Sequence, residues 1–109
     1  MEDRELLELA AKAAGLKNAL FYNEDDGKGW YAKTGKREYW RPLTDDGDAL
    51  RLAVKLRIDI RQFAQDDGRV SCLVDRLGYG WGEAVGDDPY AATRRAIVRA
   101  AAEIWRAAS

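Results

Sequence analysis

Residues 40–56, WRPLTDDGDALRLAVKL, hold a dense group of oxygen-bearing side chains just before an apolar segment. The members of this acidic cluster are Thr44, Asp45, Asp46 and Asp48. Such a group could bind Mg²⁺ or Ca²⁺, cradle a phosphate, or cap the first turn of a helix. Each of these three roles requires a different spacing of residues, so the sequence can be tested against each.

The spacing favours the helix cap. A calcium loop of the EF-hand type that begins at Asp46 needs an acid at its fifth position and a glutamate at its twelfth, where Leu50 and Arg57 stand. A phosphate-binding loop needs several glycines and a lysine ahead of the helix. Side-chain oxygens at a first turn accept from free N–H groups and face the positive end of the helix dipole. We therefore predict a cap and no metal site, with a hydrated ion held by the exposed acids as the alternative.

The residue types that carry most enzyme chemistry are scarce. The chain has no histidine, which removes the commonest general base near neutral pH and the usual ligands of transition metals. The single cysteine, Cys72, alternates with Val70 and Val74, so we expect it in the core and not as a nucleophile. The conspicuous acid pairs stand at turns or helix starts. These observations predict a protein that is not an enzyme and has no cofactor.

Aromatic and basic residues alternate in the segment KGWYAKTGKREYWR, residues 28–41. Its aromatic members are Trp30, Tyr31, Tyr39 and Trp40. Aromatic rings beside Lys and Arg can stack nucleic-acid bases, and they are also the residues enriched at the centres of protein interfaces. Tyr79 and Trp81, flanked by glycines, form a second candidate patch. The alternative is ordinary packing, in which one residue of each adjacent aromatic pair points inward and the other is merely amphipathic.

Arginines supply a third candidate surface. On a helical wheel of the last predicted helix, Arg95, Arg99 and Arg106 form one stripe opposite the apolar side. Such a stripe is usually a solvated face, although it could also contact a partner. Arg94 falls on the apolar side, so we expect it to reach the rim of the core or to meet a carboxylate.

The composition is that of a globular domain, with 47% apolar and 34% charged residues among 109. Eighteen basic against nineteen acidic residues leave a net charge of -1, so any nucleic-acid binding must come from a local patch. No apolar segment approaches the roughly 18 residues that span a bilayer, and MEDRELLEL lacks the basic start of a signal peptide. We therefore expect a single domain, residues 1–109, in the cytoplasm.

Three segments have the hydrophobic period of helices. The first covers residues 3–14 and ends at Gly15, which suits a left-handed cap. The second covers 46–57, and Leu50 and Val54 widen its apolar arc so far that we expect it to be the most buried of the three. The third opens at Asp88 as N-cap, with Pro89 at the first helical position.

Stretches with a period of two residues lie between these helices. They are residues 19–23, 29–33, 58–64, 70–75 and 79–85. The resulting order, αββαβββα, predicts an α+β domain with one sheet of about five strands, mainly antiparallel, covered by the three helices on at least one face.

Two segments, YWRPLTDDGDALRLAVKL and GDDPYAATRRAIVRAAAEIW, together with the helix ending AAGL, resemble the phage ABA sandwich family of small phage and prophage proteins. The family patterns W-x-P-x-x-D and D-P-x-x-A-x-x-x-A are matched by Trp40, Pro42, Asp45, Asp88, Pro89, Ala92 and Ala96. The resemblance does not extend to residues 18–36 or 59–80. It implies a three-layer α/β/α sandwich and a phage origin, and no agreed activity.

The sequence therefore favours a small, non-enzymatic phage accessory protein that binds a host protein in the bacterial cytoplasm. Small phage proteins of this kind often block a host system, so inhibition of a defence system such as CRISPR is the sharpest form of this hypothesis, by analogy with gene context. A module that binds nucleic acid or a nucleotide is the alternative. A structural or regulatory phage component is a further alternative.

Overall fold

The computed structural model describes residues 2–24, 29–62, 69–74, 79–84, 86 and 88–108. The three predicted helices and five predicted strands are all present, and one further strand, β3, has only two residues. In chain order the elements are α1 (Asp3–Ala13), β1 (Leu20–Glu24), β2 (Gly29–Lys33), β3 (Tyr39–Trp40), α2 (Asp46–Leu56), β4 (Ile58–Gln62), β5 (Arg69–Val74), β6 (Tyr79–Ala84) and α3 (Pro89–Ala108).

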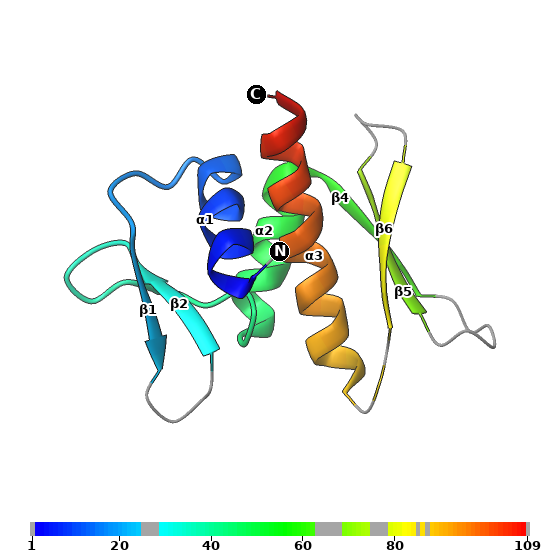
Figure 1. Cartoon of the computed structure of the whole chain (residues 1–109), viewed down its shortest axis with the longest axis horizontal. Coiled ribbons are helices and arrows are strands. Elements are labelled where there is room, and N and C mark those ends of the chain that lie inside the picture. Colours follow the sequence, from blue (N-terminus) through cyan, green and yellow to red (C-terminus); the bar gives the residue numbers. More distant parts are fainter. Residues whose placement is uncertain are drawn as a thin grey trace.

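The prediction of one five-stranded sheet is wrong. The strands form two separate antiparallel sheets, a first sheet in the order β1-β2-β3 and a second sheet in the order β4-β5-β6. The two sheets lie on opposite sides of the helices, so the layers run sheet, helices, sheet (Figure 1). This arrangement also replaces the expected α/β/α sandwich, in which a sheet would lie between helices.

The physical reason lies in the alanines of the helices. In the part of the chain that the structure describes, more than half of the buried hydrophobic residues are alanines, and these small side chains let helices approach closely. Helix α1 packs more extensively against α3 than any other pair of elements in the described chain, while α1 also contacts β2 and α3 covers all three strands of the second sheet. Each sheet therefore has its own helix to cover it, and the helices bury their remaining sides against one another.

The helix ends follow the predicted caps. Asp45 is the N-cap of α2 and accepts a hydrogen bond from the Asp48 N–H at 2.8 Å. Asp88 accepts from the N–H groups of Tyr90 and Ala91 at the start of α3. At the end of α1, Gly15 has a φ of 78°, a left-handed conformation that glycine adopts without steric cost. The capping predictions at these three positions are confirmed.

Helix α2 is less buried than expected. Leu50 is 58% exposed and Val54 is 71% exposed, so two of the residues that widened its apolar arc lie outside the core. Helix α3 is the central element instead, because it packs against α1, α2 and the second sheet. The stripe of α2 that carries Leu50 and Val54 is thus an apolar surface that no described element covers.

Within the described residues, no helix is long and apolar enough to cross a membrane.

Candidate partner-binding face

The outer face of the first sheet carries a row of tyrosines. Tyr22 of β1 pairs in register with Tyr31 of β2. Tyr39 of β3 pairs with Lys33, which stands two residues after Tyr31 on β2, so Tyr39 lies on the same face of the sheet as Tyr31. The ring centroid of Tyr31 lies 5.7 Å from that of Tyr22 and 5.9 Å from that of Tyr39. Tyr22 is 41% exposed and Tyr39 is 50% exposed. These three tyrosines and Arg41, described next, are referred to as the tyrosine face.

Arg41 completes the row. Its guanidinium carbon lies 4.3 Å from the centroid of the Tyr31 ring and 5.4 Å from that of Tyr39, both within the range of a cation–π interaction. The arginine therefore covers part of the Tyr31 ring and helps to order the row of tyrosines.

The acidic cluster holds the backbone of Arg41 in place. The Arg41 N–H donates to the Asp48 Oδ2 at 2.8 Å, and the Arg41 carbonyl accepts from the N–H groups of Thr44 and Asp45 at 3.0 and 2.7 Å. The Asp48 side chain is only 15% exposed, so this charge-assisted hydrogen bond is partly shielded from water. The cap of α2 thus fixes the point from which the Arg41 side chain reaches back over the tyrosines.

Two carboxylates of the cluster also form ion pairs. Asp46 pairs with Arg94 of α3, and Asp48 pairs with Arg51 one turn further along α2. The same Arg94 also donates to the Leu43 carbonyl at 3.0 Å. Its pair with Asp46 confirms the prediction that this arginine meets a carboxylate. Among the described residues, no group of three or more acids, cysteines or histidines is arranged to hold a metal ion.

We therefore expect millimolar Mg²⁺ or Ca²⁺ to leave the melting temperature unchanged. A ligand that binds only the folded state raises stability by mass action, and each carboxylate of the cluster is already engaged by an N–H group or an arginine. Thermal melts with and without each ion measure this. A rise of several degrees that disappears in Asp46→Asn would contradict the capping interpretation.

The two tryptophans of the predicted aromatic patch face the other way. Trp30 is half-buried on the side of β2 that includes the fully buried Ala32, with the Arg4 guanidinium of α1 5.4 Å from its ring centroid. Trp40 pairs in register with Ala32 and packs against the core. The patch thus divides as the packing alternative stated, with Tyr31 and Tyr39 outside and Trp30 and Trp40 inside. For the second patch, the side chains of Tyr79 and Trp81 lie outside what the structure describes.

The arginine stripe lines one polar hollow of about 400 Å³ together with Leu6 of α1 and Glu83 of β6. Each of its arginines has a carboxylate partner: Arg95 pairs with Asp3, Arg99 with Glu83 at 2.9 Å, and Arg106 with Glu103 at 2.8 Å. The first two pairs connect α3 to α1 and to the second sheet. Because its charges are matched within the chain, this stripe is better explained as a connection between elements than as a surface for an anion.

Sequence reasoning missed two members of the tyrosine face, Tyr22 and Arg41. Both were detectable in principle, since Tyr22 stands at an alternating position of the first predicted strand and Arg41 stands two residues after Tyr39. What the sequence lacked was the pairing of β1 with β2, which places Tyr22 opposite Tyr31. Lys33 lies opposite Tyr39 on this face, and the exposed Lys36, Arg37 and Glu38 stand in the segment that joins β2 to β3, so the charges next to Tyr39 along the chain are mainly basic.

Comparisons with models of protein families, with curated proteins and with solved structures each returned no match, so the function of this chain has to be inferred from its geometry.

Proposed function

We propose that the protein is a non-enzymatic binding module that contacts an acidic surface of a partner protein through the tyrosine face. The observation that carries this proposal is the exposure of Tyr22 and Tyr39 at 41% and 50% in a row already ordered by Tyr31 and Arg41. Tyrosine and arginine are the residue types most enriched at the energetic centres of protein interfaces. Because the side chains are ordered before binding, little conformational entropy is lost on association.

A protein partner accounts for this face better than a nucleic acid does. Single-stranded nucleic acids bind by stacking bases on open aromatic rings. Here the central ring, Tyr31, has the Arg41 guanidinium over it and a tilted tyrosine on either side, so a base would have to displace these contacts. An acidic protein surface can instead contact the tyrosine edges and hydroxyls and leave the row intact, while Lys33, Lys36 and Arg37 orient it.

The resemblance to a phage family gives this proposal its setting: a phage accessory protein whose partner is a bacterial host protein, with a component of a defence system as the sharpest form. The matching residues have structural roles in this fold, since Pro42 is fully buried, Asp45 and Asp88 cap helices, and Pro89 opens α3. The sandwich that the resemblance implied is not the fold of this chain, so the resemblance supports only the phage setting, and the tyrosine face alone supports the binding role.

Truncation of Tyr39 to alanine is expected to weaken partner capture on the order of thirtyfold, the loss typical of an aromatic hot spot. The melting temperature should stay nearly unchanged, because half of this side chain is already in water. The experiment uses the protein as bait for bacterial lysate, followed by titration of the captured protein against Tyr22→Ala, Tyr31→Ala and Tyr39→Ala.

Tyr90→Ala supplies the matched control, because Tyr90 is 69% exposed but lies at the start of α3, away from the first sheet. This variant should bind as the wild type does. Equal loss in Tyr90→Ala and Tyr39→Ala, or normal binding by all three tyrosine-face variants, would exclude the tyrosine face as the contact surface. A salt-sensitive complex with single-stranded DNA or RNA that Tyr39→Ala abolishes would assign the face to nucleic acid instead.

A further inference from the structure

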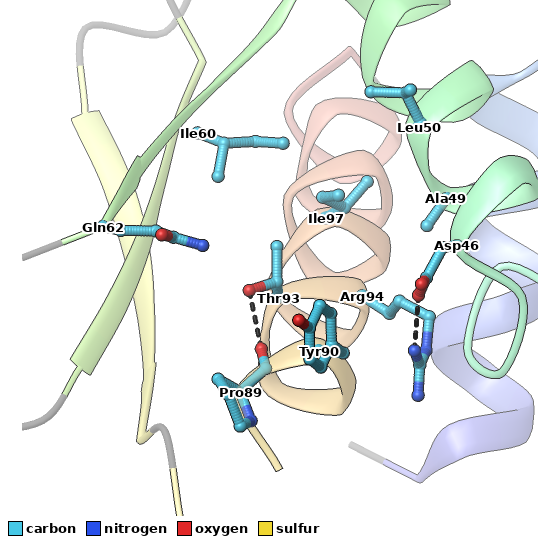
Figure 2. Close-up of a pocket in the computed structure, with 10 residues that line it drawn as sticks. All are labelled: Asp46, Ala49, Leu50, Ile60, Gln62, Pro89, Tyr90, Thr93, Arg94 and Ile97. Atoms are coloured by element: carbon cyan, nitrogen blue, oxygen red, sulfur yellow. Dashed lines mark hydrogen bonds and ion pairs between the residues drawn. The ribbon is translucent and has the colours of Figure 1, made fainter.

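The free edge of the second sheet lies beside an apolar groove. In the part of the chain that the structure describes, β4 pairs with β5 alone, so its other edge presents unpaired N–H and C=O groups. The groove encloses about 450 Å³ between this edge, α2 and α3. Figure 2 shows Ile60 and Gln62 of β4 pointing into it from one side and Leu50 of α2 from the other, with Ile97, Thr93 and Tyr90 of α3 forming its floor.

Large apolar side chains are exposed around this groove. Leu50 is 58%, Val54 71%, Ile60 36% and Tyr90 69% exposed. Leu50 and Val54 are four residues apart on α2, so they share one side of the helix. An open strand edge beside uncovered apolar side chains is a combination that soluble proteins normally avoid unless another chain covers it.

The sequence of β4 is complementary to itself when read in the opposite direction. In an antiparallel pair of two copies of IDIRQ centred on Ile60, Asp59 of one copy stands opposite Arg61 of the other, and this happens twice. Ile60 then faces its own copy on the side of the groove. Asp59 and Arg61 are both exposed, and within the described part of the chain their side chains form no ion pair or hydrogen bond, while their backbone pairs with β5.

We propose that the partner of this edge is a second copy of the chain, which pairs β4 to β4 about a twofold axis at Ile60 and joins two second sheets into one six-stranded sheet. A twofold interface requires a surface that is complementary to itself, which IDIRQ provides. The same association brings the apolar stripe of α2, Leu50 and Val54, toward the axis from both copies. This proposal is independent of the tyrosine face, which lies on the other sheet.

The charges select this register over its neighbours. A pair centred on Asp59 places two aspartates opposite each other, and a pair centred on Arg61 places two arginines opposite each other; like charges directly opposite one another are destabilising. Edge charges of this kind usually prevent strand pairing altogether. Here they discourage general aggregation and still permit one symmetric pair.

Charge exchange tests the register. Sedimentation of the wild type across the micromolar range should show a monomer–dimer equilibrium. Asp59→Arg and Arg61→Asp should each raise the dimer dissociation constant about tenfold, because each puts like charges opposite one another at two sites. The double variant Asp59→Arg/Arg61→Asp restores opposite charges and should return the constant to near the wild-type value. Lys17→Asp, an exposed charge change distant from β4 in sequence and outside either sheet, serves as the control and should have no effect.

A cysteine pair tests the axis directly. Ile60→Cys places the new thiol opposite its own copy, within the distance that a disulfide spans, whereas Asp59→Cys places the two thiols two residues apart along the strands, beyond the roughly 7 Å limit. Both variants are made in a Cys72→Ala background, because Cys72 stands opposite Ile60 in the β4–β5 pair and would form a disulfide within one chain with a thiol at position 60. Mild oxidation should then give a covalent dimer with Ile60→Cys and none with Asp59→Cys. A wild type that stays monomeric, a double variant as weak as the single ones, or equal cross-linking at both positions would overturn the proposal.

Discussion

The Cys72 thiol should react with a maleimide about a thousandfold more slowly in the folded protein than in the denatured chain at pH 8. Burial raises the pKa of this thiol from 9.0 to about 12, and the negative charge of Glu83 acts in the same direction. Only the thiolate is nucleophilic, so this rise in the pKa lowers the thiolate fraction at pH 8 by about a thousandfold. A labelling time course in buffer and in guanidinium chloride, followed by mass spectrometry, measures the ratio.

The same pKa change has a consequence for stability. The pKa of the thiol is higher in the folded state than in the unfolded state, so above pH 9 the unfolded chain loses its proton first. The free energy of unfolding therefore falls as the pH rises from 9 toward 12. Cys72→Ala should therefore reduce the loss of stability over this alkaline range relative to the wild type.

Rapid labelling in native buffer would contradict the fully buried position of Cys72 in β5.

The helices could be predicted because their signals are local. Asp45 and Asp88 precede apolar periodic segments, and Gly15 follows one, so the information that starts or ends each helix lies within a few residues of the boundary. Pro89 at the first position of α3 is a signal of the same kind. Cap geometry requires no knowledge of the rest of the fold, and these predictions are confirmed.

The division into two sheets could not be predicted from the same local patterns. Alternation identifies a strand but not its neighbour, and pairing depends on contacts distant in sequence. The third strand of the first sheet, Tyr39–Trp40, is too short to produce an alternating pattern. The sequence therefore showed only two strands before α2, and two strands alone suggested membership of a larger sheet. The helical wheels also counted alanine as simply apolar, whereas alanines such as Ala96 and Ala100, both fully buried, let helices pack directly on one another.

The candidate site was partly predictable for a related reason. Adjacent aromatic pairs must split between the two faces of a strand, which the alternation of Trp30 with Tyr31 and of Tyr39 with Trp40 predicts. Which face is outermost depends on where α1 lies, and α1 contacts β2 from the side of the buried Ala32. The sequence therefore identified the segment of the site but assigned its tryptophans and tyrosines equal weight, and only the tyrosines face outward.

Leu7→Ala should be the most destabilising of the substitutions considered, with a loss of about 2–5 kcal/mol of unfolding free energy. Leu7 is 0% exposed and is among the largest fully buried side chains of the described residues. Removing its three outer carbons leaves a cavity that rigid helices cannot close, since α1 is held by its extensive contact with α3. Thermal denaturation should show a fall of about 10 °C or more for a domain of this size.

Leu20→Ala is the matched control for this change, because Leu20 is 59% exposed at the start of β1 and its truncation should alter stability by no more than about 0.5–1 kcal/mol. Helix α1 also contacts β2 of the first sheet, so unfolding of this helix removes the support of the tyrosine face. Partner capture by Leu7→Ala is then expected to fall only as the folded fraction falls, and to recover on cooling, whereas Tyr39→Ala loses binding while it remains folded. Full stability of Leu7→Ala would mean that α1 is not packed as the structure places it, and would remove the support that α1 gives to the first sheet.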